Sequence, residues 1–317
     1  MTEGSEDRRP DEKSEEIPSA STDVAAEGSA IDQTEGPVPP LSPTRTFPLF
    51  TSDAALRFAE TRSMTGRRGA TLALLMGEVK SGKTTLLAEL WNWLLSRGTL
   101  GGHTIAGSRT ALAFEQRAYY SRVASAAEEA FTIHTPEEED GLLHLRVARP
   151  GGERVELFFA DYAGEHFRRI REGVPLVREL PWVSRVDRFL VLVDGRQFAI
   201  PGNREVAVTR ARRQLHALGV SEAVVGTARI AIVLTKADVL PEPEREAFRR
   251  IAPSLLELAR PMDSEAVVLE VAARPSHGAQ AEGLDDLLAF VARPDRTSAR
   301  PDEQHPIPSR LIARFRA

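Results

Sequence analysis

The sequence contains no cysteine among its 317 residues. This absence excludes disulfide scaffolds, thiolate zinc sites and cysteine nucleophiles. No apolar run approaches the roughly 18 residues that a membrane-spanning helix needs, so we do not expect a transmembrane segment. The opening residues MTEGSEDRRPDEKSEE are acidic and polar, which argues against a secretory signal and favours a cytoplasmic protein.

Lysine is also scarce, and its few positions are informative. Of the 41 basic residues only Lys13, Lys80, Lys83 and Lys236 are lysines. The acidic charge is confined to one end, because residues 1–45 carry 4 basic and 11 acidic side chains, a net −7 within a total of −5. The rest of the chain is therefore close to neutral at +2, and a nucleic-acid partner is not expected.

Three regions differ in composition. Residues 1–45 are rich in Glu, Ser, Thr and Pro, and we predict a disordered acidic tail there. Residues 46–293 are expected to form one domain, and residues 294–317 a tail rich in Pro and Arg. Strands are predicted at 71–77, 142–148, 154–160, 188–194, 229–235 and 266–272, and helices at 53–62, 83–98, 111–129, 203–218, 242–259 and 284–293.

The alternation of strands and helices predicts an α/β fold of three layers, with helices on both faces of a mostly parallel six-stranded sheet. Pro150-Gly151-Gly152 separates two of the strands and predicts a hairpin, which makes one strand antiparallel. Residues 99–135 are expected to form an otherwise irregular insert that contains one helix. In such sheets ligands bind at the carboxyl ends of the parallel strands.

The segment GEVKSGKT, residues 77–84, fits the phosphate-binding pattern G-x-x-x-x-G-K-[ST] between a predicted strand and a predicted helix. Glycines allow the backbone to curl so that its N–H groups face phosphate oxygens, and the helix N-terminus favours the anion. The Lys83 ammonium is expected at the phosphates and the Thr84 hydroxyl at Mg²⁺. The residues expected to contact the nucleotide here are Gly77, Val79, Lys80, Ser81, Gly82, Lys83, Thr84 and Thr85.

Two further motifs follow strands of the same predicted sheet. Asp161-Tyr162-Ala163-Gly164 places a carboxylate where it can hold Mg²⁺ through water, and the Gly164 N–H where it can meet a γ-phosphate. Thr235-Lys236-Ala237-Asp238 ends another strand. The Asp238 carboxylate can accept two hydrogen bonds from guanine, and Lys236 can cover the base, whereas adenine offers no such donor pair.

Together these motifs resemble those of the P-loop GTPases of the translation-factor and Ras-like class, over residues 70–293. Thr235 stands where most members have Asn, as in Rho-like members, and the resemblance implies that Ala273 gives a backbone N–H to the guanine. The long insert and the sequence GEVKSGKTTLLAEL are similar to bacterial double-GTPase domains, which are encoded near conflict or regulatory gene systems. The resemblance implies GTP or GDP and Mg²⁺ as cofactors.

Glu165 and His166 depart from the pattern of Ras-like GTPases, which carry Gln directly after the motif's Gly. A carboxylate beside a γ-phosphate is repelled, so we expect slow hydrolysis. His166 is a candidate to orient the attacking water, and the competing interpretation is an ordinary surface histidine.

GTPases of this class use a threonine just before the second strand to contact Mg²⁺, and this sequence has two candidates for it. Thr135 precedes the strand at 142–148, and Thr110 lies nearer the phosphate loop beside Arg109. Arg109 is also a candidate to neutralise charge in the transition state, although a surface arginine is the more ordinary reading.

The sequence thus predicts a GTP-binding protein with slow, Mg²⁺-dependent hydrolysis. It would act as a switch whose partner proteins contact residues 99–135 and 161–180. The C-terminal residues 309–317 alternate arginine with apolar residues and are candidates for peripheral membrane contact. An ATP-binding P-loop NTPase and a non-hydrolysing nucleotide-binding scaffold remain as alternatives, and Glu165 favours the second.

Overall fold

The computed structural model describes residues 49–50, 55–61, 70–119, 141–274 and 281–294. The predicted N-terminal tail, the C-terminal tail beyond residue 294, residues 120–129 of the predicted helix and Thr135 lie outside the described residues. Within the described residues, no helix combines the length and the apolar character needed to cross a membrane.

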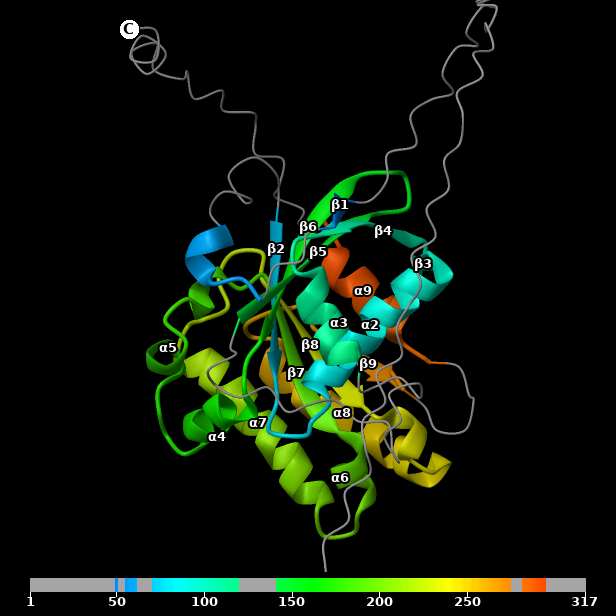
Figure 1. The fold of residues 1–317 in the computed structure, drawn as a ribbon. Coiled ribbons are helices and arrows are strands. Elements are labelled where there is room, and N and C mark those ends of the chain that lie inside the picture. Colours follow the sequence, from blue (N-terminus) through cyan, green and yellow to red (C-terminus); the bar gives the residue numbers. More distant parts are fainter. Residues whose placement is uncertain (1–48, 51–54, 62–69, 120–140, 275–280, 295–317) are drawn as a thin grey trace, which may run out of the picture. The chain divides into compact units, whose positions relative to one another are not determined.

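The described chain forms one mixed sheet of nine strands (Figure 1). The strands are β1 Leu49–Phe50, β2 Ala70–Met76, β3 Thr99–Leu100, β4 His103–Ser108, β5 Gly141–Ala148, β6 Arg154–Asp161, β7 Arg188–Asp194, β8 Arg229–Thr235 and β9 Val267–Val271. Their order is β1-β4-β5-β6-β2-β7-β8-β9, with β3 paired to β4. From β6 to β9 all neighbours are parallel, whereas β5 runs antiparallel to both β4 and β6. The mostly parallel sheet with an antiparallel hairpin strand is thereby confirmed.

All six predicted strands form, and β1, β3 and β4 extend the sheet beyond them. Strands β3 and β4 lie in the segment predicted to be irregular. The sequence of β4, HTIAGS, lacks regular alternation, and its pairing with β5 shifts register between Ile105 and Gly107. An irregularity of this kind interrupts the period-two pattern by which strands are recognised.

Helices follow most of the strands. They are α2 Lys83–Arg97, α3 Ala111–Tyr119, α4 Gly164–Arg171, α5 Leu176–Glu179, α6 Gly195–Ala199, α7 Arg204–Val220, α8 Glu242–Ala259 and α9 Leu284–Ala292, with 3-10 turns η1 Phe58–Thr61, η4 Val183–Arg185 and η5 Ala237–Val239. Helix α2 ends at Gly98, whose φ of 72° is the left-handed conformation expected of a glycine cap. Of the predicted helix 53–62, the described part forms only the short turn η1.

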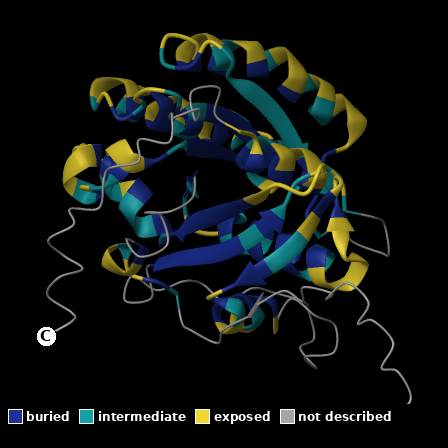
Figure 2. Cartoon of the chain, turned by 90° about the horizontal axis from the view of Figure 1, so that it is seen from above, coloured by how far each residue is buried: buried dark blue, intermediate teal, exposed yellow. Residues whose placement is uncertain are grey.

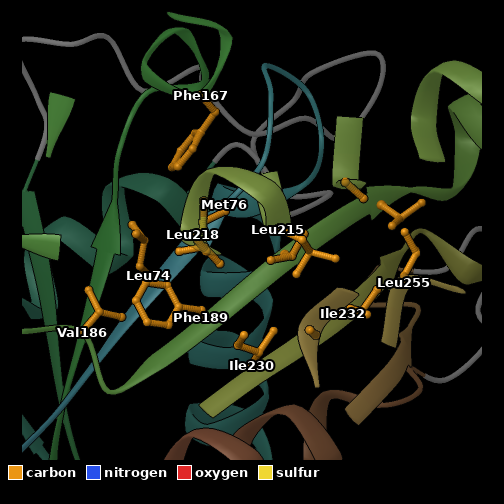
Figure 3. Packing of buried hydrophobic residues seen from close by; sticks show 14 of the residues in the cluster. Leu74, Met76, Phe167, Val186, Phe189, Leu215, Leu218, Ile230, Ile232 and Leu255 are labelled. Carbon is orange, nitrogen blue, oxygen red and sulfur yellow. The ribbon is translucent and has the colours of Figure 1, made fainter. Parts of the chain in front are cut away.

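Side chains of the central strands alternate between two cores. From β2, Leu74 and Met76 join the core formed with α4, α7 and α8, and Ala73 and Leu75 join the core formed with α2, α3 and α9. The central strands are buried and the outer helix faces are exposed (Figure 2). Figure 3 shows side chains of the first core, among them Leu74, Phe189 and Leu218. The sheet is therefore the middle of three layers. The carboxyl ends of its parallel strands lie along one edge of the sheet.

Candidate functional site

The phosphate-loop segment joins β2 to α2 at this edge. Lys80 has φ 66° and Gly82 has φ 98°, so the loop curls through two left-handed residues. The Lys83 Nζ donates hydrogen bonds to the carbonyl oxygens of Gly77, at 2.8 Å, and Glu78, at 3.1 Å. Lys83 is thus buried against its own loop, with its ammonium held by the first two residues of that loop.

Thr84 and Asp161 meet beside the loop. Asp161 is the last residue of β6 and is fully buried, and its Oδ1 lies 3.3 Å from the Thr84 Oγ1. A hydroxyl and a carboxylate are oxygen donors of the kind that Mg²⁺ prefers. Within the described residues no group of three or more His, Cys, Asp and Glu forms a metal cage. The donor set therefore fits a magnesium ion that takes further oxygens from a phosphate or from water.

The other oxygen of Asp161 is already paired. The Arg117 Nε donates to Asp161 Oδ2 at 2.6 Å, and Arg117 Nη1 donates to the Ala113 carbonyl at 3.1 Å. Arg117 lies in α3 and is 9% exposed. Sequence reasoning did not single out this arginine, because nothing in its local pattern distinguishes it from the other arginines of the chain.

The loop after β8 is tied to the phosphate loop. Thr235 Oγ1 donates to the Ser81 carbonyl at 2.8 Å, and Lys236 Nζ donates to the Lys80 carbonyl at 2.6 Å. The same ammonium lies 2.9 Å from Asp194 Oδ2, at the end of β7. Asp194 was also not predicted, although a carboxylate at a strand end, like Asp161, was a usable signal.

Asp238 and Ala273 belong to neighbouring loops. The parallel pairing of β8 with β9 sets Thr235 opposite Val271, so both strands end at the same level. Asp238 then lies partly buried in η5, and Ala273 is buried just beyond β9. Their arrangement places the residues predicted for guanine recognition at the same edge as the phosphate loop.

Gly164 lies directly against the phosphate loop. A Cβ at this position would come within 2.2 Å of the Val79 backbone nitrogen, so any other residue would displace one of the two segments. Glu78 of the loop pairs with Arg171 of α4 and, at 3.2 Å, with Arg210 of α7. These pairs, which the sequence did not indicate, hold α4 and α7 to the loop.

His166 faces α5 in this structure. Its Nδ1 lies 2.5 Å from Glu179 Oε1, and Arg169 Nε donates to the same oxygen at 2.9 Å. The hydrogen bond from Arg169 lowers the pKa of Glu179, burial opposes it, and the hydrogen bond with His166 lowers it further. Glu165, the other candidate, is half-buried in the first turn of α4.

Thr110 is buried at the junction of β4, α3 and β5. Its Oγ1 accepts the His144 N–H at 2.8 Å, and its carbonyl accepts the Phe114 N–H at the start of α3. The Arg109 side chain is exposed, while its N–H donates to His144 Nδ1 at 2.9 Å. The Thr110 hydroxyl is thus engaged by β5, and the other candidate, Thr135, lies outside the described residues.

A family model described as Double-GTPase 2 matches residues 73–292, a span that includes every strand-end loop of the site. The chain belongs to the Double-GTPase 2 family. Its α/β sheet is that of a P-loop GTPase domain of the double-GTPase type, as the resemblance predicted. A GTPase-like family points to GTP as the ligand.

Several solved structures are similar to the chain at low sequence identity. The bacterial selenocysteine-specific elongation factor EF-Sec is 16% identical, with a TM-score of 0.36, and the match covers 69% of this chain and 28% of EF-Sec. The S. cerevisiae Ski7 GTPase-like domain bound to GTP is 13% identical, with a TM-score of 0.40 and coverages of 75% and 52%. The chain thus spans about half or less of these two proteins.

The signal recognition particle receptor complex SRb-GTP/SRX from Chaetomium thermophilum contains another similar chain. It is 14% identical, with a TM-score of 0.37, and the match covers 69% of this chain and 98% of that one. No curated protein matches the sequence.

Proposed function

We propose that this double-GTPase-type domain, residues 46–293, binds GTP with Mg²⁺, hydrolyses it slowly and acts as a nucleotide-dependent switch in the bacterial cytoplasm. The observation that carries the proposal is the contact of Lys236 with the Lys80 carbonyl at 2.6 Å. It joins the loop suited to guanine to the loop suited to phosphate, so one nucleotide can engage both.

Each part of the site has a separate task. The loop amides and Lys83 hold the phosphates, and Asp238 with the Ala273 N–H selects guanine. Thr84 and Asp161 would hold Mg²⁺, which neutralises charge on the phosphate oxygens when bound. Gly164 lies against the loop, and its N–H would donate to the γ-phosphate.

Slow hydrolysis follows from the residues after Gly164. The Glu165 carboxylate follows Gly164 directly, so its negative charge would oppose a γ-phosphate bound there. His166 is held by Glu179 and Arg169. His166 would have to leave its contacts with Glu179 and Arg169 before it could orient a water molecule. Glu165 also supports a second candidate function, a nucleotide-binding scaffold that does not hydrolyse. A site for ATP is less well supported, because Asp238 suits guanine.

The switch would present α3, α4 and α5 to partner proteins. Leu112 and Tyr119 of α3 and Val177 of α5 are exposed apolar side chains within the segments 99–135 and 161–180. Exposed apolar residues on elements that border the nucleotide are suited to partners that sense its state. The tail 309–317 is a candidate for peripheral membrane contact.

Phosphate release under single-turnover conditions tests the proposal. We expect wild-type protein to release phosphate from GTP slowly but above the buffer background, and the Lys83→Ala variant not to exceed that background. The same substitution at Lys13, a lysine outside the proposed domain, is the matched control and should leave the rate unchanged. Release that is unaffected by Lys83→Ala would contradict the proposed reaction.

A further inference from the structure

The ion pair between Arg117 and Asp161 joins the insert to the proposed metal site. The Arg117 Nε lies 2.6 Å from Asp161 Oδ2, while Asp161 Oδ1 lies 3.3 Å from the Thr84 hydroxyl. Asp161 is fully buried and Arg117 is nearly so. One carboxylate therefore contacts both the proposed Mg²⁺ ligand Thr84 and a cation from α3.

A buried carboxylate needs a compensating positive charge. In this structure the Arg117 guanidinium provides it. A magnesium ion held by Thr84 and by water on Asp161 would provide the same compensation from the other side. Two cations beside one buried carboxylate repel each other, so we treat them as alternative partners rather than joint ones.

We propose that Arg117 and Mg²⁺ compete for Asp161, and that this competition couples helix α3 to the metal. The proposal rests on the proposed nucleotide binding and deepens it by naming how the insert responds. The start of α3 is anchored by Thr110, whose hydroxyl and carbonyl contact His144 and Phe114. Arg117 lies in the last turn of α3, so its release removes the ion pair that ties this turn to β6.

The fold contains a reporter for a change in how α3 packs against α2. The Trp91 ring of α2 stacks on Phe114 of α3 at 4.8 Å with an interplanar angle of 8°, and its Nε1 donates to Glu115 at 2.6 Å. The chain has three tryptophans, and the other two are Trp93 and Trp182. A W93F/W182F background therefore leaves Trp91 as the single tryptophan, whose emission senses α3.

The first measurement titrates Mg²⁺ against binding of fluorescent GTP. We expect Arg117→Gln to lower the half-saturating Mg²⁺ concentration at least about tenfold, because the carboxylate no longer has to leave a guanidinium. Arg117→Lys keeps a positive charge, so its half-saturating Mg²⁺ concentration should lie between those of wild type and Arg117→Gln. Arg154→Gln is the matched control. Arg154 is an exposed arginine at the other end of β6 from Asp161, and the variant should have the Mg²⁺ dependence of wild type.

The Asp161→Asn background tests whether the effect passes through this carboxylate. There Arg117→Gln should no longer change the half-saturating Mg²⁺ concentration, as a double-mutant cycle requires of two directly coupled groups. Thermal unfolding by circular dichroism establishes that each variant is folded. Equal Mg²⁺ dependence of wild type and Arg117→Gln, with both folded, overturns the proposal.

The second measurement needs no substitution of Arg117. It therefore tests the coupling between Mg²⁺ and α3 even if Arg117→Gln does not fold. In the W93F/W182F protein with bound nucleotide, Mg²⁺ should shift the Trp91 emission, and the shift should saturate with metal binding. An emission spectrum that stays constant while Mg²⁺ tightens nucleotide binding overturns the coupling but leaves the proposed function intact. Failure of wild type to bind fluorescent GTP at any Mg²⁺ concentration overturns both.

Discussion

The Thr235 hydroxyl donates a hydrogen bond to the Ser81 carbonyl oxygen over 2.8 Å, although 154 residues separate them in the chain. This contact and the one between Lys236 and Lys80 hold the loop after β8 against the phosphate loop. The two ends of the proposed nucleotide site are therefore positioned by each other as well as by the sheet.

Removing the Thr235 hydroxyl should weaken nucleotide binding. Thr235→Val keeps the shape and leaves the Ser81 carbonyl without this donor, which costs about 1–3 kcal/mol when the acceptor is buried. We expect a fall in affinity for fluorescent GTP of about fivefold or more, as 1.4 kcal/mol is tenfold. Thr104→Val, at an exposed strand position, is the control and should bind as wild type does. An unchanged affinity in Thr235→Val would show that the contact does not shape the site.

Asp238 should determine the choice of base. Asp238→Asn replaces an acceptor by an amide that can donate, so affinity for GTP should fall and affinity for xanthosine triphosphate should rise. Competition of both nucleotides against a fluorescent analogue measures the two affinities. The matched control is Asp286→Asn, an exposed carboxylate in the first turn of α9, which should alter neither. Parallel losses for both nucleotides, with no change of preference, would remove the guanine assignment.

Glu165 should limit the rate of hydrolysis. Glu165→Gln removes the charge that opposes the γ-phosphate and supplies an amide able to orient water, so the single-turnover rate should rise, by about tenfold if the charge costs 1.4 kcal/mol. His166→Ala should leave the rate at the wild-type value if the histidine stays with Glu179, and should lower it if His166 orients the water. A rate in Glu165→Gln at or below that of wild type would contradict the role assigned to Glu165.

The sequence was most informative where function depends on strand ends. Strands β7 and β8 and helix α8 have the bounds that their apolar patterns predicted, and the loops that follow β2, β6 and β8 carry the three motifs. A parallel sheet brings such ends to one edge, so placing the motifs together required only the correct order of elements.

The insert was predicted poorly because its interactions are not local. Because the pairing of β4 shifts register, its sequence lacks the alternation by which a strand is predicted. The ion pair of Arg117 with Asp161 depends on how α3 lies beside α2 and β6. The chain has 37 arginines, and none of their sequence contexts indicates which one reaches a buried carboxylate. Contacts of this kind are decided by tertiary structure alone.

Glu156 should make stability depend on acid pH. Burial raises the pKa of this carboxyl, but the hydrogen bonds from His144 and Arg146, together with the positive charge of these groups, outweigh burial and hold the pKa below the ordinary value of 4.5. A lowered pKa in the folded state gives stability that is complete above the ordinary value and is lost as pH falls through the lowered one. Stability of wild type should therefore decline in that acid range.

The Glu156→Gln variant tests this dependence by urea unfolding at several pH values. The variant should be less stable than wild type near neutral pH, by about 1–3 kcal/mol, because charged hydrogen bonds are lost. The difference should narrow as pH falls below 4.5 and wild type takes up the proton. Glu257→Gln, on an exposed face of α8, should follow wild type throughout. If the difference in unfolding free energy between wild type and Glu156→Gln stays constant with pH, the stabilisation comes from side-chain shape rather than from charge.

Competition for fluorescent GTP in the presence of Mg²⁺ tests the central claim most directly. If the site joins a phosphate loop to a guanine-selective loop, unlabelled GTP should displace the probe at concentrations at least about 100-fold lower than ATP, since a buried unpaired carboxylate opposes adenine. The Lys83→Ala variant should bind the probe weakly or not at all. Equal displacement by ATP and GTP, or undiminished binding in Lys83→Ala, would contradict the account.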